Sequence, residues 1–89
     1  MLSYRVAYYL PTQPNQKVLA KALDFPGAVS QGFDLADARV MIASALEDLA
    51  EVQLELGNPL PSPDADATDP EADLIELVQL KVAAGAGIR

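Results

Sequence analysis

The sequence of 89 residues contains no cysteine and no histidine. Their absence removes disulfides, thiolate or imidazole zinc sites, thiol nucleophiles and any histidine base. No apolar run approaches the length of a membrane span, and the start Met1 to Arg5 lacks the layout of a secretory signal. We therefore expect a cytoplasmic protein without membrane contact. A magnesium or calcium site built from carboxylates stays open on composition alone.

Basic residues are also scarce, because six Lys and Arg stand against thirteen Asp and Glu and give a net charge of −7. The basic residues form no run, whereas nucleic acid binding needs them clustered. We expect no direct binding to DNA or RNA. An acidic surface suits a basic protein partner, although the same charge can simply keep a small domain soluble.

One long helix is predicted over residues 34–56. Asp34 and Asp37 suit a capping-box-like start, and Gly57 supplies the left-handed residue that commonly ends a helix. Apolar residues recur in steps of three and four, which indicates one buried stripe: Leu35, Ala38, Ile42, Ala45, Leu46, Leu49, Val52 and Leu56. Such a stripe needs a flat apolar partner.

Three strands are predicted before this helix. Residues 2–10 alternate, with Leu2, Tyr4, Val6, Tyr8 and Leu10 on one face, and residues 17–23 resume an extended pattern after a turn-rich loop. Small inner side chains in 17–23 would let a helix lie close. A tight turn at Asp24 to Gly27 leads to a short strand over 28–31.

After the helix, residues 58–73 are rich in proline and acid and indicate an extended surface crossing. Residues 74–82 alternate and favour a fourth strand, although the start Asp69-Pro70-Glu71 also suits a helix. Residues 83–89 are expected to be a tail. The chain of residues 1–89 is thus interpreted as one α+β domain of order β-β-β-α-β, with a mostly antiparallel sheet and one helix on one face.

Three motifs flank or open the long helix: Asp24 to Gly32 (DFPGAVSQG), Asp34 to Ala38 (DLADA) and Gly57 to Pro61 (GNPLP). Together they resemble the HicB-like antitoxin family, whose pattern is D-x-P-G-x-x-x-x-G, then T-x-x-E-A, then G-x-x-x-P. The residues that carry the match are expected to be structural: Asp24, Pro26, Gly27, Gly32, Asp34, Asp37 and Gly57. Asp34 replaces the usual threonine and Asp37 the usual glutamate, and both changes preserve capping.

The resemblance implies a truncated ribonuclease-H-like fold. It also implies a partner, a small basic HicA-like toxin that cleaves messenger RNA. Full-length relatives usually carry a C-terminal DNA-binding domain, and this chain is expected to lack one. We therefore predict an antitoxin-type protein that masks such a toxin by protein–protein contact, with homo-oligomers, dimers or tetramers, as a further expectation.

No catalytic constellation, cofactor site or metal site is predicted, because the first strand has no acid and no serine has a base partner. The expected toxin-facing residues lie on the helix: Glu47, Asp48, Glu51 and Glu55. An orphan domain that only self-associates, through Leu19, Leu23 and an open strand edge, is the alternative. A magnesium-dependent nuclease is a remote one. Gly27→Val should reduce stability rather than selectively abolish partner binding.

Overall fold

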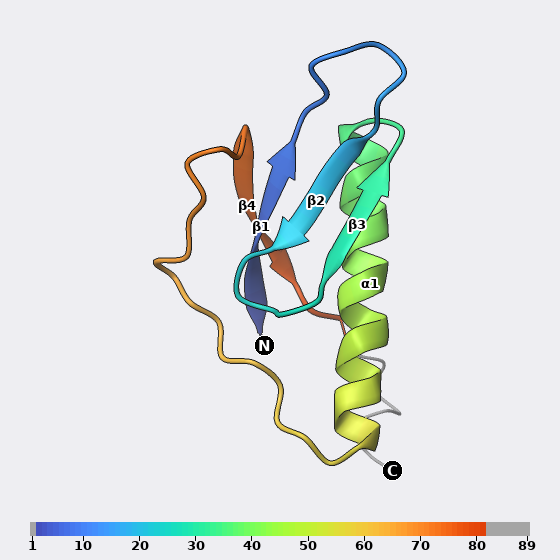
Figure 1. Ribbon diagram of the computed structural model, residues 1–89. Coiled ribbons are helices and arrows are strands. Elements are labelled where there is room, and N and C mark those ends of the chain that lie inside the picture. Colours follow the sequence, from blue (N-terminus) through green and yellow to red (C-terminus); the bar gives the residue numbers. More distant parts are fainter. Residues whose placement is uncertain (1, 82–89) are drawn as a thin grey trace.

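The computed structural model describes residues 2–81 and places them in a four-stranded sheet with one long helix on one face (Figure 1). The elements are β1 (Ser3–Tyr9), β2 (Val18–Ala22), β3 (Val29–Gly32), α1 (Leu35–Glu55) and β4 (Leu74–Gln79). In space the strands follow the order β3-β2-β1-β4, and each neighbouring pair is antiparallel. The predicted α+β class and the element order β-β-β-α-β are confirmed.

Strand β1 lies inside the sheet, and its alternating sequence supplies much of the core. Tyr4, Val6 and Tyr8 are fully buried on the face that carries the helix. Leu10 was predicted on this face too, but it is 46% exposed because the strand ends before it. Ala7 points to the opposite face and is buried as well. Both faces of β1 are therefore covered.

Helix α1 packs against β2 and β3 through small and aliphatic side chains (Figure 1). The buried helical residues are Ala38, Ile42, Leu46 and Ala50, and the buried residues of β2 are Val18, Ala20 and Ala22. The small side chains of β2 let the helix approach closely, as the sequence predicts. Full burial of one large aliphatic side chain contributes roughly 1.5–3 kcal/mol, so the buried Ile42 and Leu46 contribute substantially to the stability of the core.

Both ends of α1 carry the predicted caps. The Asp34 carboxylate accepts from the Asp37 N–H at 2.7 Å, and the Asp37 carboxylate accepts from the Phe33 N–H at 2.9 Å. At the other end Gly57 has φ +77°, and the Asn58 N–H donates to the Gln53 carbonyl at 2.9 Å. This bond and the left-handed glycine form a Schellman motif.

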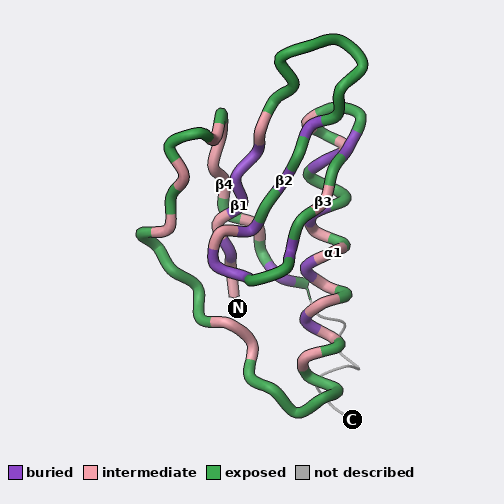
Figure 2. Tube along the Cα trace, in the orientation of Figure 1, coloured by how far each residue is buried: buried purple, intermediate pink, exposed green. Residues whose placement is uncertain are grey.

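The last turns of α1 correct one part of the predicted stripe. Val52 is 49% exposed and Leu56 is 68% exposed, although both were expected to be buried. The reason is geometric, because the C-terminal part of α1 extends beyond the ends of the strands (Figure 2). Periodicity identifies the face of a helix but not the length over which a sheet covers it.

Two glycines act in different ways. Gly32 ends β3 and is buried, and a Cβ atom there would overlap the backbone of Asp37 and Ala38 at the start of α1. Gly27 has φ +87° in the turn before β3, and open space surrounds it. A side chain at Gly27 is therefore opposed by backbone strain, and one at Gly32 by a close approach of the helix.

Strand β4 pairs with β1, which confirms strand rather than helix for this part of the chain. The register joins Ser3 to Gln79 and Tyr8 to Leu74, and the Leu80 N–H extends the ladder by donating to the Leu2 carbonyl at 2.8 Å. Residue 82 of the predicted strand and the predicted tail at 83–89 lie outside the described residues.

The crossing, residues 58–73, is held against the sheet by polar contacts from β1. The Tyr4 hydroxyl donates to the Pro61 carbonyl at 2.7 Å, and the Arg5 Nε donates to the Ala67 carbonyl at 2.7 Å. The Tyr9 hydroxyl donates to the Asp69 carboxylate at 2.6 Å. Because Arg5 and Tyr9 point away from α1, the part of the crossing that they hold, at Ala67 and Asp69, lies on the face of the sheet opposite the helix.

Candidate protein-binding site

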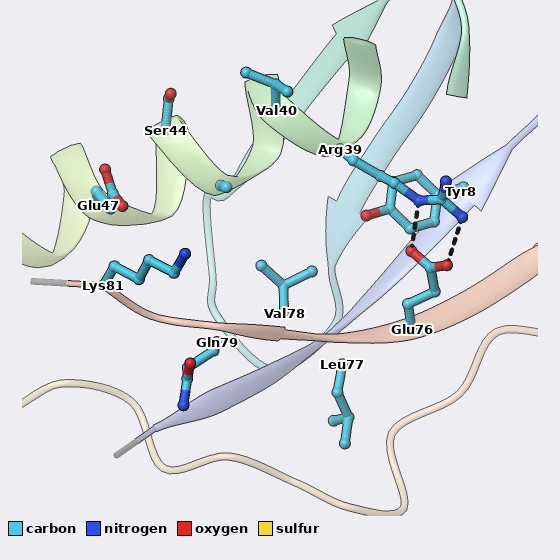
Figure 3. Close-up of a pocket in the computed structure, with 11 residues that line it drawn as sticks. Tyr8, Arg39, Val40, Ser44, Glu47, Glu76, Leu77, Val78, Gln79 and Lys81 are labelled. Carbon is cyan, nitrogen blue, oxygen red and sulfur yellow. Dashed lines mark hydrogen bonds and ion pairs between the residues drawn. The ribbon is translucent and has the colours of Figure 1, made fainter. Parts of the chain in front are cut away.

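Within residues 2–81, helix α1 leaves part of its own face of the sheet uncovered. A helix is about 10 Å wide and strands lie about 4.8 Å apart, so one helix covers about two strands. Because α1 packs on β3 and β2, a cavity of about 580 Å³ remains between α1 and β4, here called the groove (Figure 3). It is lined by Tyr8, Arg39, Val40, Ala43, Ser44, Glu47, Glu76, Leu77, Val78, Gln79 and Lys81.

An ion pair closes one end of the groove. Arg39 on α1 donates to both carboxylate oxygens of Glu76 on β4, with Nε–Oε1 at 3.0 Å and Nη2–Oε2 at 2.6 Å (Figure 3). These hydrogen bonds lower the pKa of Glu76 and raise the pKa of Arg39. Glu76 is the one charged residue within β4, so Arg39 neutralises the formal charge of the strand.

The Tyr8 hydroxyl lies beneath this ion pair and is directed into the groove (Figure 3). Tyr8 is fully buried, and its hydroxyl has no hydrogen-bond partner among the described residues. Burial, and next the nearby charge of Glu76, raise the pKa of Tyr8 to about 12. An unpaired buried hydroxyl costs about 1–3 kcal/mol. A polar group that enters the groove can relieve that cost by bonding to Tyr8.

The four acids that the sequence predicts as partner-binding residues do not form one cluster. Glu47 lines the groove at the end opposite the ion pair, near Lys81 (Figure 3). Glu51 and Glu55 follow it at intervals of four residues along the helix, and both keep solvent access. Asp48 is exposed but turned about 100° away from Glu47 around the helix axis. Their role in binding stays a prediction.

Asp24 has a wider structural role than the turn that the sequence indicates. It is 9% exposed, and its two carboxylate oxygens accept from the Arg5 N–H and the Asp64 N–H, each at 2.9 Å. One side chain thus ties the turn before β3 to both β1 and the crossing. No local signal reveals this, because Asp64 lies 40 residues further along the chain.

The remaining site predictions are placed as follows. Leu19 is 46% exposed on the face of β2 opposite α1, and Leu23 is partly buried after that strand. Pro26 is exposed in the turn beside Gly27. Within residues 2–81, no group of three or more acidic, histidine or cysteine side chains is arranged to hold a metal ion. Over the same residues, no helix is long and apolar enough to span a membrane.

The antiparallel sheet, the single covering helix and the order β-β-β-α-β define a HicB-like fold, as solved structures demonstrate. The N-terminal domain of the Burkholderia pseudomallei antitoxin HicB matches with TM-score 0.71 and 20% identity, over 91% of this chain and 100% of that one. The antitoxin HicB of that organism gives TM-score 0.69 and 19% identity, over 97% and 67% of the two chains. A chain of the HicA3 and HicB3 toxin–antitoxin complex gives TM-score 0.64 and 20% identity, over 90% and 99%.

At this level of identity the likeness concerns the fold. No protein-family model and no curated protein matches the sequence. The resemblance drawn from the Asp24 to Gly32 motif is nevertheless confirmed at the level of the fold, because the whole described arrangement matches and not the motif alone.

Proposed function

We propose that this chain is a HicB-like antitoxin, which binds a small basic HicA-like toxin that cleaves messenger RNA and masks it by protein–protein contact. The observation that carries the proposal is the shared fold, because one of the matched structures is a toxin–antitoxin complex. The net charge of −7 supports it, since an acidic surface speeds and orients encounter with a basic protein.

The contact surface proposed on this chain is the groove together with the acidic side of α1 beside it. Glu47 lines the groove, and Glu51 extends the same helical row. The unpaired Tyr8 hydroxyl and the apolar Val78 lie in the same groove. An anchor side chain with an apolar stem and a polar tip matches this lining, while the acids attract the surrounding basic surface.

The first test is co-expression of the tagged chain with its neighbouring genes, followed by mass analysis of what co-purifies. A small basic protein in a defined ratio, released at high salt and inhibited in messenger RNA cleavage by this chain, is the expected result. A neighbouring basic ribonuclease that neither binds this chain nor is inhibited by it would overturn the proposal.

A pair of charge-matched variants then locates the surface. Glu47→Gln with Glu51→Gln removes two negative charges beside the groove, and Asp66→Asn with Glu71→Gln removes two from the crossing on the opposite face. We expect the first pair to weaken toxin binding about tenfold, and the second pair to change it far less, because close charge complementarity depends on position. Equal losses would mean that net charge alone drives binding.

The orphan self-associating domain keeps one observation in its favour: among residues 2–81, no strand pairs with the outer edge of β4. Association through Leu19 and Leu23 stays a prediction, and only Leu19 is substantially exposed. No observation favours the magnesium-dependent nuclease. Both Asp24 oxygens are already engaged by backbone N–H groups, and Asp34 and Asp37 cap α1.

A further inference from the structure

The outer face of β2 and β3, which points away from α1, is exposed to solvent. Buried and exposed residues alternate along β2, and its buried residues face the helix (Figure 2). In the register of the two strands, Leu19 lies beside Gln31. Lys21 lies beside Val29 in the same way, and paired residues project from the same face of a sheet. These four residues and the next pair of the register are called the lysine face: Lys17, Leu19, Lys21, Val29, Gln31 and Phe33.

An aromatic ring and a cation meet at one end of the lysine face. Because Val18 pairs with Gly32, the next pair of the register joins Lys17 and Phe33. The Lys17 Nζ lies 5.0 Å from the centroid of the Phe33 ring, a distance at which a cation and a ring attract each other. Phe33 is still 80% exposed, so most of its side chain stays available to a partner.

The apolar side chains of the lysine face form a cluster. Leu19 is 46% exposed, and Val29 on the neighbouring strand is 58% exposed. Together with Phe33, they place three large apolar side chains on the same side of two paired strands. Single exposed apolar residues are common on protein surfaces, whereas clusters of them mark surfaces that contact other molecules.

The charge of the lysine face is opposite to that of the whole molecule. Lys17 and Lys21 are exposed and are the two charged residues of this face, while the chain carries −7. Within residues 2–81, neither lysine forms an ion pair. The crossing borders the face over β1, where Tyr9 pairs with Leu19 and the Asp69 carboxylate accepts from the Tyr9 hydroxyl. The lysine face therefore attracts acidic groups at short range.

The dimensions of the lysine face match one helix. A helix is about 10 Å wide and two strands lie about 4.8 Å apart, and α1 covers β2 and β3 in this way on the inner face. Lys17 and Lys21 lie four residues apart, which is about 14 Å along an extended chain. About nine residues of a helix, or between two and three turns, span the same length.

We propose that the lysine face binds an acidic amphipathic helix of another protein. The apolar stripe of that helix packs on Leu19, Val29 and Phe33, and carboxylates two to three turns apart on its flank contact the two lysines. Charge complementarity selects this occupant. Nucleic acid is a poorer match, because the net charge of −7 repels phosphates and two lysines form no basic run.

This partner differs from the proposed toxin in both charge and position. The toxin is basic and is expected at the groove, which lies on the helix side of the sheet. The lysine face lies on the other side, so both partners can bind at once. Six residues are few beside the roughly 20–30 that a standard interface uses on each side, and we expect a dissociation constant of about 0.1–1 mM.

The test is a nuclear magnetic resonance titration of the isotope-labelled full chain with a synthetic peptide of about 18 residues, long enough to form a helix. The peptide carries a leucine stripe flanked by glutamates, and a control peptide has glutamine in place of each glutamate. We expect the acidic peptide to shift amides of β2 and β3 and to bind at least about tenfold more tightly than the control at about 0.1 M salt.

Net charge alone gives the opposite result, because a chain of charge −7 repels an acidic peptide at long range. Tight binding of the acidic peptide at β2 and β3 thus identifies local complementarity. The absence of shifts up to about 2 mM peptide, or shifts confined to the groove, would overturn the proposal.

Two pairs of matched variants test the residues of the lysine face. Lys21→Gln removes a positive charge from it, and Lys81→Gln removes one at the groove. We expect the first to weaken peptide binding about threefold and the second to leave it unchanged. Phe33→Ala should weaken binding about tenfold, whereas Val40→Ala, at a residue that is 63% exposed beside the groove, should not. Equal effects within each pair would refute the assignment.

Three further measurements separate this proposal from its alternatives. A single-stranded oligonucleotide that shifts the same amides at lower concentration than the peptide would assign the face to nucleic acid. Shifts of these amides on concentrating the chain alone would assign it to a second copy. Lys21→Gln and Phe33→Ala should leave toxin binding unchanged, while Glu47→Gln with Glu51→Gln should leave peptide binding unchanged. Either proposal can therefore fail without the other.

Discussion

Helix α1 and the crossing cover opposite faces of the same sheet, and different interactions hold them in place. On the helix side the contact is apolar, with Ile42 and Leu46 buried against the strands. On the other side Arg5, Tyr9 and Asp24 hold the crossing by hydrogen bonds. Strand β1 contacts both α1 and the crossing, because its successive side chains point to opposite faces of the sheet. The comparison indicates that burial of apolar side chains stabilises the helix side, whereas hydrogen bonds fix the path of the crossing along the other side.

The largest expected effect concerns the helix cover. Ile42→Ala should lower the free energy of unfolding by about 2–5 kcal/mol, because it leaves a cavity in the buried layer. Met41→Ala is the matched control, since Met41 precedes Ile42 and is 44% exposed, and it should cost less than about 1 kcal/mol. Urea unfolding measures both. Equal costs would mean that α1 does not carry the core as described.

The crossing should respond to loss of its central tie. Asp24→Ala removes the acceptor of two backbone N–H groups, and we expect a loss of about 3 kcal/mol. Hydrogen exchange at the Asp64 amide should accelerate more than exchange in α1. Asp66→Ala changes an exposed acid nearby and should have little effect. Uniform acceleration across α1 and the crossing would contradict the division between the two covers.

Alkaline pH should lower the free energy of unfolding through tyrosines on both faces of β1. Burial raises the pKa of Tyr8 to about 12, and burial together with the Asp69 hydrogen bond raises the pKa of Tyr9 to about 12. Because these pKa values are higher in the folded than in the unfolded chain, ionisation of the two tyrosines favours unfolding. Their contribution to the free energy of unfolding is therefore complete below about pH 10 and is lost as the pH rises towards 12. Urea midpoints across this range should reveal a loss of about 2 kcal/mol. A flat profile would contradict it.

The smallest expected effect comes from removing a single hydroxyl oxygen on either face of β1. Among residues 2–81 the Tyr8 hydroxyl has no hydrogen-bond partner, whereas the Tyr9 hydroxyl donates to the Asp69 carboxylate at 2.6 Å. Tyr8→Phe should therefore stabilise the protein by about 1 kcal/mol, and Tyr9→Phe should destabilise it by about 1 kcal/mol. Thermal and urea unfolding of the two variants test the opposite signs. If both destabilise equally, Tyr8 has a partner that is not apparent among the described residues.

The fold was predictable where the signals are local. Alternation in β1, the capped and periodic α1 and the left-handed Gly57 each depend on neighbouring residues, and each agrees with the structure. The errors arise where length matters. Leu10, Val52 and Leu56 have the right periodicity but lie beyond the sheet or helix region that could cover them.

The candidate site was less predictable because its parts come from distant segments. Arg39 meets Glu76 across 37 residues, and Tyr8 enters the same groove from β1. Sequence reasoning selected Glu47 from its place on the polar face of the helix, and it lines the groove. It did not select Arg39, Glu76 or Tyr8. The opposite charges of Arg39 and Glu76 carry no information about proximity until β4 has been assigned a register.

The pairing of β1 with β4 also has a consequence for synthesis of the chain. Ser3 pairs with Gln79, so β1 is synthesised more than 60 residues before the start of its partner strand β4. At about 5–20 residues per second, this interval lasts several seconds. Until then, the backbone groups of Tyr4, Val6 and Tyr8 that β4 will satisfy remain unpaired along the nascent chain. The interior strand of the finished sheet thus begins as an exposed edge, and it is covered only after β4 has been synthesised.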